Sequence, residues 1–285
     1  KEEVVAMKIP KILPLVAVCS LWLFSPPSWA AVEPQKPSEA LSSARYQSLF
    51  KELRKKGFSQ AEINAVFLDE RVRFNAELAR RLKSKISAKS FNYFSEEFGL
   101  LNKESLASGK YVANRYEFAF QKAEKKYGVD RFAVLAIMRV ESYFGKYLGN
   151  ELVINNLSTL FFHSKRRSDW AKGELVSLFL LVRESKADIF ELKGSWAGAF
   201  GLVQFVPSSY RLRAVDGNGD GKIDLFDFED AIFSAANFLK AAGYRSGDAA
   251  AMEKAIFQYN HSRAYVKATL AYREAIRDYL KERDS

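Results

Sequence analysis

The decisive stretch of this chain runs Val134-Leu-Ala-Ile-Met-Arg-Val-Glu-Ser-Tyr-Phe-Gly145. Its apolar residues predict a buried helix, and a lone carboxylate, Glu141, stands near the end of that helix. A carboxylic acid held against apolar side chains has its charged form disfavoured, so its pKa rises. Such an acid keeps its proton near neutral pH, as a general acid must. Taken alone, Glu141 could equally be an exposed residue that pairs with Arg139 or Lys146.

A second stretch, further along the chain, runs Gly194-Ser-Trp-Ala-Gly-Ala-Phe-Gly-Leu-Val-Gln-Phe-Val-Pro-Ser-Ser-Tyr210. Small and aromatic residues surround one amide, Gln204. A polar amide among Phe200, Leu202 and Phe205 needs hydrogen-bond partners, which a sugar could supply. The two stretches together favour a functional site over an isolated surface carboxylate.

Composition excludes several classes of site. The chain has 285 residues, of which 48% are hydrophobic, enough for one substantial core or two modest ones. Its net charge of +10 favours an anionic polymer or a membrane surface as partner. Nucleic acid is disfavoured, because the basic residues are scattered and no nucleic-acid motif is present. With only His163 and His261, a three-histidine zinc site is impossible, and a Ser-His-Asp site would have to use one of them.

From Met7 to Ala30 the chain has the pattern of a secretory signal peptide, and residues 1–6 are interpreted as upstream sequence. Lys8 and Lys11 give the positive start, residues 12–24 the apolar middle, and Ser28-Trp-Ala30 the small-residue cleavage site. The alternative is a membrane anchor, but Pro14 interrupts an apolar run that is already short for a span. The sequence therefore predicts export to the periplasm.

The single cysteine, Cys19, lies inside this segment and follows Val18, whereas lipoprotein cleavage sites have a small residue there. The sequence therefore predicts a mature chain without disulfides, which is membrane-associated only if Cys19 carries a lipid. We expect a flexible lead over 31–43, since it contains prolines and small polar residues.

The remaining chain predicts a mainly α-helical fold. Ser59-Gln-Ala-Glu62 is a capping box, and Asp130 is the expected N-cap of the helix that carries Glu141. The pattern over 104–127 predicts one long helix that ends before Gly128. Convincing strands are scarce, apart from a small hairpin expected within 190–225. We divide the chain into an N-terminal helical region, 44–125, and a second domain, 126–285.

A polar loop, Asp216-Gly-Asn-Gly-Asp-Gly-Lys-Ile-Asp-Leu-Phe-Asp227, has the spacing of an EF-hand calcium loop. Oxygen ligands stand at loop positions 1, 3 and 5, Gly221 at position 6 allows the sharp turn, and Asp224 at position 9 could act through water. Position 12 carries Asp in place of the usual Glu. The alternative is a metal-free turn. We predict a structural calcium ion with the ligands Asp216, Asn218, Asp220, Lys222 (through its carbonyl) and Asp227.

Four blocks in order resemble the membrane-bound lytic transglycosylase B family: Tyr127-Gly-Val-Asp130, the stretch 134–145, the stretch 192–210 and the loop 216–227. The resemblance is strongest over residues 126–262. It implies a lysozyme-like catalytic domain that cleaves peptidoglycan, and it adds weight to calcium in the loop. The expected partners are glycan strands and other cell-wall enzymes, and the expected state is a monomer.

The resemblance also implies roles for individual residues. Glu141 matches the single catalytic acid and base of the family, and the Tyr259-Asn260 pair matches one that closes the cleft. Packing residues and solvated loop charges are the alternatives for several of the others. The expected substrate contacts are Ser195, Gln204, Phe205, Tyr259, Asn260, Arg166 and Arg167.

The number of carboxylates bears on the reaction. A typical glycosidase flanks the scissile bond with two carboxylates. No Asp or Glu occurs in 194–215, so the second stretch supplies none, and Glu151 and Glu174 lie outside the matched blocks. The family route is intramolecular and leaves a 1,6-anhydro ring on the muramic acid at the cleaved MurNAc-GlcNAc β-1,4 bond. The alternatives are a lysozyme-type hydrolase, a non-catalytic wall-binding protein and a calcium-responsive interaction module.

Overall fold

The structure is a computed structural model, and it describes residues 36–83 and 91–281. The predicted signal peptide lies outside the described residues. Of the expected lead, residues 36–43 are described, and Pro37–Ala40 form a short 3-10 helix. None of the helices in the described ranges is long and apolar enough to cross a membrane.

The fold is mainly helical, which confirms the predicted class. Ser59 and Glu62 form the predicted capping box at the start of the second helix. The helices of the described residues are α1 (Ala44–Lys55), α2 (Gln60–Phe67), α3 (Ala76–Lys83), α4 (Lys103–Arg115), α5 (Glu117–Tyr127), α6 (Arg131–Ser142), α7 (Val153–His163), α8 (Ser168–Ser185), α9 (Pro207–Arg213), α10 (Phe228–Ala241), α11 (Ala249–Tyr259) and α12 (Arg263–Lys281).

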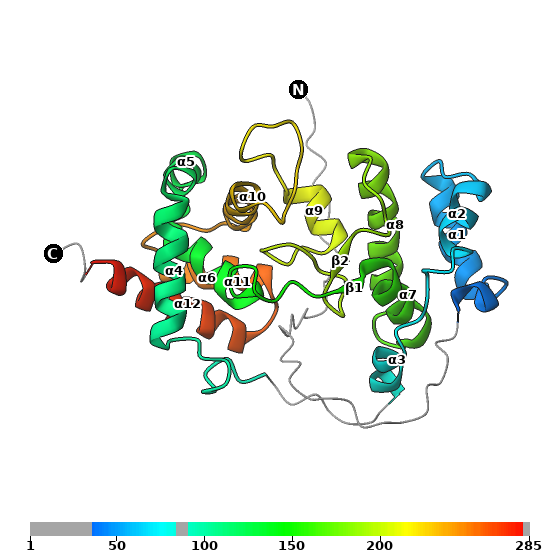
Figure 1. The fold of residues 1–285 in the computed structure, drawn as a ribbon, viewed down its shortest axis with the longest axis horizontal. Coiled ribbons are helices and arrows are strands. Elements are labelled where there is room, and N and C mark those ends of the chain that lie inside the picture. Colours follow the sequence, from blue (N-terminus) through cyan, green and yellow to red (C-terminus); the bar gives the residue numbers. More distant parts are fainter. Residues whose placement is uncertain (1–35, 84–90, 282–285) are drawn as a thin grey trace.

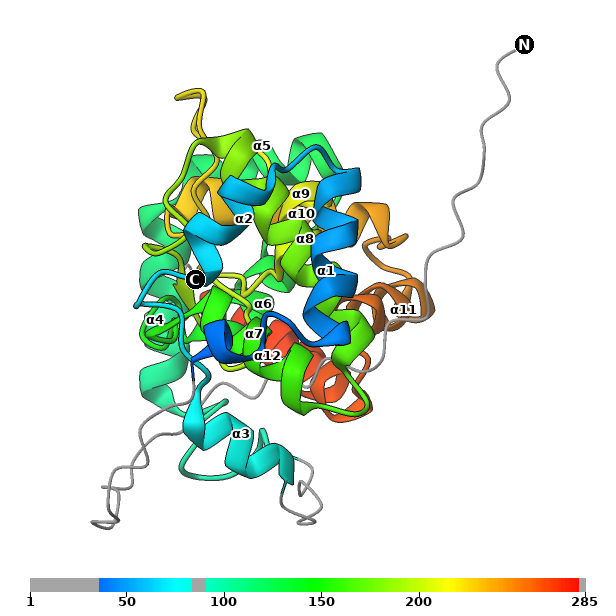
Figure 2. The same ribbon diagram turned by 90° about the vertical axis from the view of Figure 1, so that its right-hand side faces the viewer.

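The helices form two groups on either side of the strands (Figure 1). On one side α1, α2 and α3 pack on α7 and α8, and in the side view α1 lies in front of α8 (Figure 2). On the other side α4 and α5 pack with α6, α10 and α12. Buried apolar side chains from both groups join one core, in which α6 is covered along most of its length. The helix that carries Glu141 therefore lies in the interior of the fold.

The small sheet differs from the predicted hairpin. Strand β1 (Glu151–Leu152) pairs antiparallel with β2 (Lys193–Gly194), and α7 and α8 lie between them in the sequence. The backbones approach so closely here that a Cβ atom on Gly149 would lie 2.2 Å from the Gly194 carbonyl oxygen. Within 190–225 the second pairing is a single bridge, Phe200 to Phe205. The sheet thus ties the second stretch to the chain that follows α6.

The helix expected over 104–127 is broken at Tyr116, where α4 ends and α5 begins. The Tyr116 ring stacks on Phe228 at the start of α10, with centroids 4.5 Å apart and planes 7° apart. This contact is long-range in the sequence, so the helical pattern alone could not predict the break.

Candidate active site

Helix α6 holds Glu141 in the interior. Asp130 caps the helix as predicted, and its Oδ1 accepts a hydrogen bond from the Ala133 amide at 3.0 Å. Every residue from Ala133 to Ser142 is buried, and Glu141 is only 2% exposed. The alternative of a surface carboxylate is therefore wrong for Glu141.

The two cations considered as partners of Glu141 have other contacts. Arg139 donates to the Ser105 hydroxyl at 2.5 Å and to the Phe98 carbonyl at 2.7 Å. Lys146 lies 3.9 Å from a carboxylate oxygen of Glu104. Burial is the largest cause of the raised pKa of Glu141.

Tyr265 on α12 is a hydrogen-bond partner of Glu141. Its hydroxyl donates to Glu141 Oε1 at 2.6 Å. Burial raises the pKa of Glu141 to about 8, and the hydrogen bond from Tyr265 opposes this shift without cancelling it. The acid is therefore mostly protonated at neutral pH. No local pattern indicated Tyr265, because it lies 124 residues from Glu141 in the sequence.

The chain after Glu141 has an unusual backbone. Tyr143, Phe144 and Gly145 have φ values of 50°, 55° and 94°, and the first two are left-handed without being glycine. Such conformations cost about 1–3 kcal/mol each and gather at functional sites. The Ser142 hydroxyl holds this turn: it accepts from the Gly145 amide at 3.0 Å and donates to the Leu202 carbonyl at 2.7 Å. Ser142 thereby joins the two diagnostic stretches.

Gln204 lies in the second stretch with φ of 47° and is buried. Its Nε2 donates to the carbonyls of Gly201 at 2.9 Å and Leu148 at 3.3 Å. The protein itself therefore supplies the partners that we had expected from a sugar, at least for the amide nitrogen. These bonds fix the tight turn that pairs Phe200 with Phe205.

The Tyr259-Asn260 pair reaches this turn from α11. The Tyr259 hydroxyl donates to the Val203 carbonyl at 2.6 Å, and its ring lies 5.8 Å from that of Phe205. Its ring is also parallel to that of Tyr265, with 6.4 Å between centroids. The structure therefore brings Phe205, Tyr259 and Tyr265 together beside Glu141.

Asn260 is 1% exposed, and neither polar atom of its side chain has a hydrogen-bond partner among the described residues. An unsatisfied buried amide costs about 1–3 kcal/mol, so it calls for a functional explanation. A bound ligand with hydroxyl or acetamido groups would supply the missing partners.

Ser195 forms a turn at the start of the second stretch. Its hydroxyl accepts from the Ala199 amide at 3.3 Å, and its carbonyl accepts from Asn156 Nδ2 at 2.9 Å. Arg167 lies over the Trp196 ring at 5.1 Å, and burial lowers the pKa of its guanidinium. Arg166 is exposed. The structure thus joins Arg167 to the second stretch through Trp196.

The two carboxylates left open by the sequence have distinct surroundings. Glu174 on α8 is buried and accepts from the Ser208 amide at 2.9 Å and the Ser208 hydroxyl at 2.7 Å. It thereby satisfies the first turn of α9, and burial raises its pKa. Glu151 is exposed on β1, opposite Gly194.

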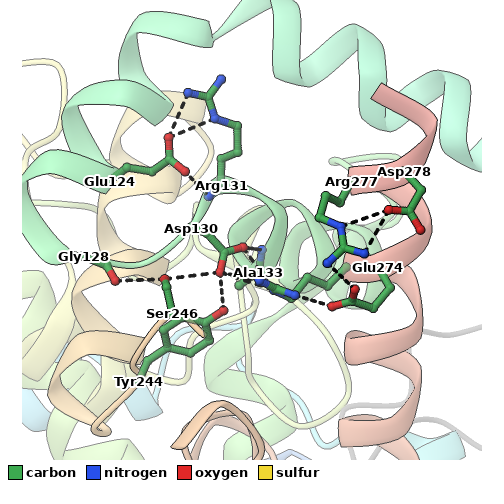
Figure 3. A network of polar contacts seen from close by, with 11 residues as sticks. Glu124, Gly128, Asp130, Arg131, Ala133, Tyr244, Ser246, Glu274, Arg277 and Asp278 are labelled. Atoms are coloured by element: carbon green, nitrogen blue, oxygen red, sulfur yellow. Dashed lines mark hydrogen bonds and ion pairs between the residues drawn. The ribbon is translucent and has the colours of Figure 1, made fainter. Parts of the chain in front are cut away.

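A polar network holds the start of α6 (Figure 3). Arg273 on α12 donates to Asp130 through Nη2 at 2.9 Å and Nε at 3.1 Å. Tyr244 lies in the loop after α10, and its hydroxyl donates to Asp130 Oδ2 at 2.6 Å. Ser246 bridges the Gly128 carbonyl and the same carboxylate oxygen. This network fixes α6 against α12 and the loop that follows α10, and the sequence predicted only the capping role of Asp130.

The side chains of the predicted calcium loop turn toward its own amides. Asp216 accepts from the Gly219 amide at 2.6 Å and the Gly221 amide at 2.9 Å, and Asp220 accepts from the Lys222 amide at 2.8 Å. In the described ranges, no three His, Cys, Asp or Glu side chains converge as a metal site would require. The donor set is nevertheless all oxygen, which is the chemistry that calcium prefers.

Asp227 and Asp230 have different roles at the end of this loop. Asp227 caps α10 and accepts from the amides of Glu229 at 2.8 Å and Asp230 at 3.1 Å. Asp230 is 1% exposed and reaches back into the loop, where it accepts from Gly217 at 2.7 Å and Asp224 at 2.6 Å. Asp230 lies outside the twelve-residue loop pattern, which ends at Asp227, so the pattern did not indicate it.

Glu141 should make the stability of the protein depend on pH. Its pKa is about 8 in the fold against 4.5 for an ordinary glutamate, so the folded state binds the extra proton between these values. Its favourable contribution is therefore full below about pH 4.5 and is lost as the pH rises through 8, at up to about 1.4 kcal/mol per pH unit. We expect the stability advantage of Glu141→Gln over the wild type, measured by urea unfolding, to grow by a few kcal/mol from pH 5 to pH 9.

The comparison of the two proteins at each pH removes the contribution of the other titrating groups. Glu151→Gln, at an exposed position, is the matched control and should follow the wild type at every pH. An advantage of Glu141→Gln that stays constant with pH would mean that Glu141 has an ordinary pKa.

Comparisons with known proteins identify the family of the chain. Residues 42–256 match the family model described as the transglycosylase SLT domain. The membrane-bound lytic murein transglycosylase B of Escherichia coli K12 is 41% identical over 149 residues, which are 52% of this chain and 41% of that protein. The match thus spans less than half the length of this relative.

Solved structures share the fold. The Escherichia coli lytic transglycosylase SLT35 in complex with bulgecin A is 26% identical with a TM-score of 0.75, covering 85% of this chain and 95% of that one. The same enzyme in complex with calcium has a TM-score of 0.74 at 26% identity, with the same coverage. SltB3 from Pseudomonas aeruginosa, solved with NAG-anhNAM-pentapeptide, has a TM-score of 0.73 at 21% identity, covering 85% of this chain and 80% of that one.

Proposed function

The chain belongs to the transglycosylase SLT domain family, and from this premise we propose that it is a peptidoglycan lytic transglycosylase. Its substrate is the β-1,4 bond between MurNAc and GlcNAc, and Glu141 is its single general acid and base. The observation that carries this proposal is the buried Glu141, which has a pKa of about 8 at the junction of the two diagnostic stretches. Lytic transglycosylase activity in relatives of the same fold supports it.

The proposed reaction uses one carboxyl group twice. Protonated Glu141 donates its proton to the glycosidic oxygen, and the bond between that oxygen and C1 of MurNAc breaks. The acetamido oxygen of the substrate stabilises the positive charge at C1. The Glu141 carboxylate then takes the proton of the C6 hydroxyl, whose oxygen bonds to C1 and closes the 1,6-anhydro ring. Glu141 is again protonated, and no water is consumed.

The surroundings of the other candidate carboxylates favour this route over a two-carboxylate hydrolase. Both oxygens of Glu174 are occupied by Ser208, and Glu151 is exposed on β1. Tyr265 is a positioning residue in this scheme, because its hydroxyl holds one oxygen of Glu141 and leaves the proton to the other.

We assign the contacts to the glycan to the residues around Glu141. Asn260 offers a buried amide without protein partners, and the Phe205 and Tyr259 rings offer apolar surface beside it. Arg167 beside Trp196 and the exposed Arg166 would contact acidic groups of the substrate. Ser195 and Gln204 would shape the wall, since their side chains hold the turns of the second stretch.

The test is digestion of purified sacculi with mass spectrometry of the products. Anhydromuropeptides are lighter by one water than the products of hydrolysis, so the two reactions are distinguished directly. We expect anhydro ends only. Products with free reducing ends from folded protein would identify a lysozyme-type hydrolase.

We also propose that the loop 216–227 binds a structural calcium ion. Asp216, Asn218, Asp220 and the Lys222 carbonyl would hold it, and the solved complex of SLT35 with calcium supports this. Asp227 stays a predicted ligand. Asp230 is a further candidate, because its buried carboxylate already lies against the loop. The ion would fix the chain between the second stretch and α10.

Removal of calcium should lower thermal stability. A ligand that binds only the folded state stabilises it by about 2.7 kcal/mol at a concentration of about 100 times its Kd. We expect a Tm several degrees higher in millimolar calcium than in a chelator, measured by calorimetry, and no such difference in Asp216→Ala. Asp169→Ala, at an almost fully exposed aspartate elsewhere, is the control. Equal Tm values for the wild type in calcium and in chelator would contradict the site.

The predicted signal peptide supports export, so we propose that the protein acts in the periplasm. The proposed activity makes glycan strands its partner.

A further inference from the structure

We propose that a pocket beside the end of α6 binds a zwitterionic amino-acid centre, an ammonium group next to a carboxylate, carried by the peptide stem of the glycan. The proposal rests on the proposed function and names a contact for the peptide part of the substrate. The pocket has a volume of about 120 Å³. None of the residues assigned above to the glycan lines it. The lining residues that matter here are Glu97, Glu104, Arg139, Tyr143, Lys146 and Tyr147.

The position of the pocket links it to the proposed catalytic helix. One wall is the last turn of α6 and the chain after it, where Tyr143 stands two residues after Glu141. The other wall is the segment 97–104, which leads into α4. Pockets for whole drug-sized ligands measure about 300–1,000 Å³, so this pocket has room for one group of a larger molecule.

The charged groups around the pocket are of both signs. Lys146 lies 3.9 Å from Glu104, beyond hydrogen-bond distance, and the two side chains are 54% and 72% exposed. Such a loose surface pair contributes little stability, so Lys146 can exchange it for a carboxylate of a ligand. Glu97, which is exposed, and Glu104 are then acceptors for an ammonium group. A ligand that carries both charges matches this arrangement.

The aromatic side chains favour a charged group over a stacked sugar ring. The rings of Tyr143 and Tyr147 meet at 88° with centroids 6.2 Å apart, so they form a corner and no flat platform. The Lys146 ammonium already lies 5.1 Å and 5.6 Å from these two ring centroids. Arg139 closes the floor at 4.1 Å from the Tyr143 ring, with its guanidinium bonded to the protein. The pocket therefore combines a fixed positive charge, Arg139, with a loosely paired one, Lys146, beside two tyrosine rings.

The experiment compares two substrates: glycan strands with peptide stems and the same strands after an amidase has removed the stems. We expect Lys146→Ala and Glu104→Gln each to raise KM for the stem-bearing strands about tenfold, the effect of one charge-assisted contact. The kcat should stay within about twofold, and the KM for stem-free strands should not follow this rise. Tyr111→Ala is the matched control, because Tyr111 is 69% exposed on α4 and does not line the pocket.

Calorimetry supplies a readout that needs no cleavage. The free tetrapeptide released by the amidase should bind to the wild type and lose about tenfold in affinity for Lys146→Ala. The same peptide with its amines acetylated should bind as weakly, since the ammonium group is gone.

Equal rises of KM on both substrates would make this a sugar subsite and overturn the proposal. So would unchanged KM values together with no peptide binding. If the peptide binds but the sacculi yield no anhydro products, the proposed function fails and this site stands. If anhydro products form but the peptide does not bind, this site alone fails.

Discussion

Replacing Glu141 with glutamine should lower the rate of release from sacculi by two to four orders of magnitude, the usual contribution of general acid-base catalysis. Glutamine has nearly the same shape and can still accept the hydrogen bond from the Tyr265 hydroxyl, which lies 2.6 Å from Glu141 Oε1. It can neither donate a proton to the glycosidic oxygen nor take one from the C6 hydroxyl. The rate should therefore fall while the fold is kept, as measured by product release and circular dichroism.

The remaining carboxylates provide the controls for this experiment. Glu151→Gln, at an exposed position on β1, should keep the activity of the wild type. If Glu151→Gln were as inactive as Glu141→Gln, the enzyme would use two carboxylates, and reducing-end products should then appear. Wild-type rates in Glu141→Gln would assign the acid to another residue.

The pH dependence of the reaction follows from the same group. In the proposed reaction the protonated form of Glu141 acts first, and its pKa in the fold is about 8. The acid form is therefore lost as the pH rises through that value. Tyr265 acts in the opposite direction, because its hydrogen bond favours the charged form. The pair thus combines burial, which keeps the proton on, with a donor that stabilises the carboxylate after the proton has left.

Local patterns in the sequence predicted the parts of the site that depend on neighbours in the chain. The apolar run around Glu141 predicted its burial, and Asp130 before that run predicted the cap. Tyr265 could not be predicted in this way, because its contact with Glu141 joins α6 to α12. The pairing of β1 with β2 could not be predicted either, because a strand of two residues is too short to show an alternating pattern.

The calcium loop shows two local patterns that compete for one residue. Asp227 stands at position 12 of the loop count and also directly before a helix, with acidic residues in the first turn. Both patterns fit the sequence, and the structure shows the second, with Asp227 as the cap of α10. Asp230 lies one turn further and faces the loop because the helix periodicity brings it there. Counting along a loop therefore cannot identify a side chain that the next helix turns toward the loop.

The second large effect concerns stability. Asp130→Ala should lower the free energy of unfolding by up to about 3–5 kcal/mol, because the buried guanidinium of Arg273 loses the carboxylate that accepts from two of its nitrogens and keeps Glu274 as its acidic contact. Arg273 is 8% exposed and donates to Asp130 through two nitrogens, and the Tyr244 hydroxyl loses its acceptor as well. The helix cap accounts for about 1 kcal/mol of the loss. Urea unfolding followed by circular dichroism measures it, with Arg277→Met at a half-exposed surface pair as the control within about 1 kcal/mol.

The double variant Asp130→Ala with Arg273→Met separates the buried charge from the lost cap. If the loss of Asp130 as partner of the buried guanidinium causes most of the destabilisation, replacing Arg273 as well should restore about 2 kcal/mol or more relative to Asp130→Ala alone. If the double variant is less stable than Asp130→Ala, the packing of Arg273 outweighs its charge, and the network holds α6 mainly by contact.

Either single variant should also lower kcat at temperatures where it stays folded, because the network fixes the start of the helix that carries Glu141. A destabilised variant with an unchanged kcat would show that α6 is held in place by the core alone.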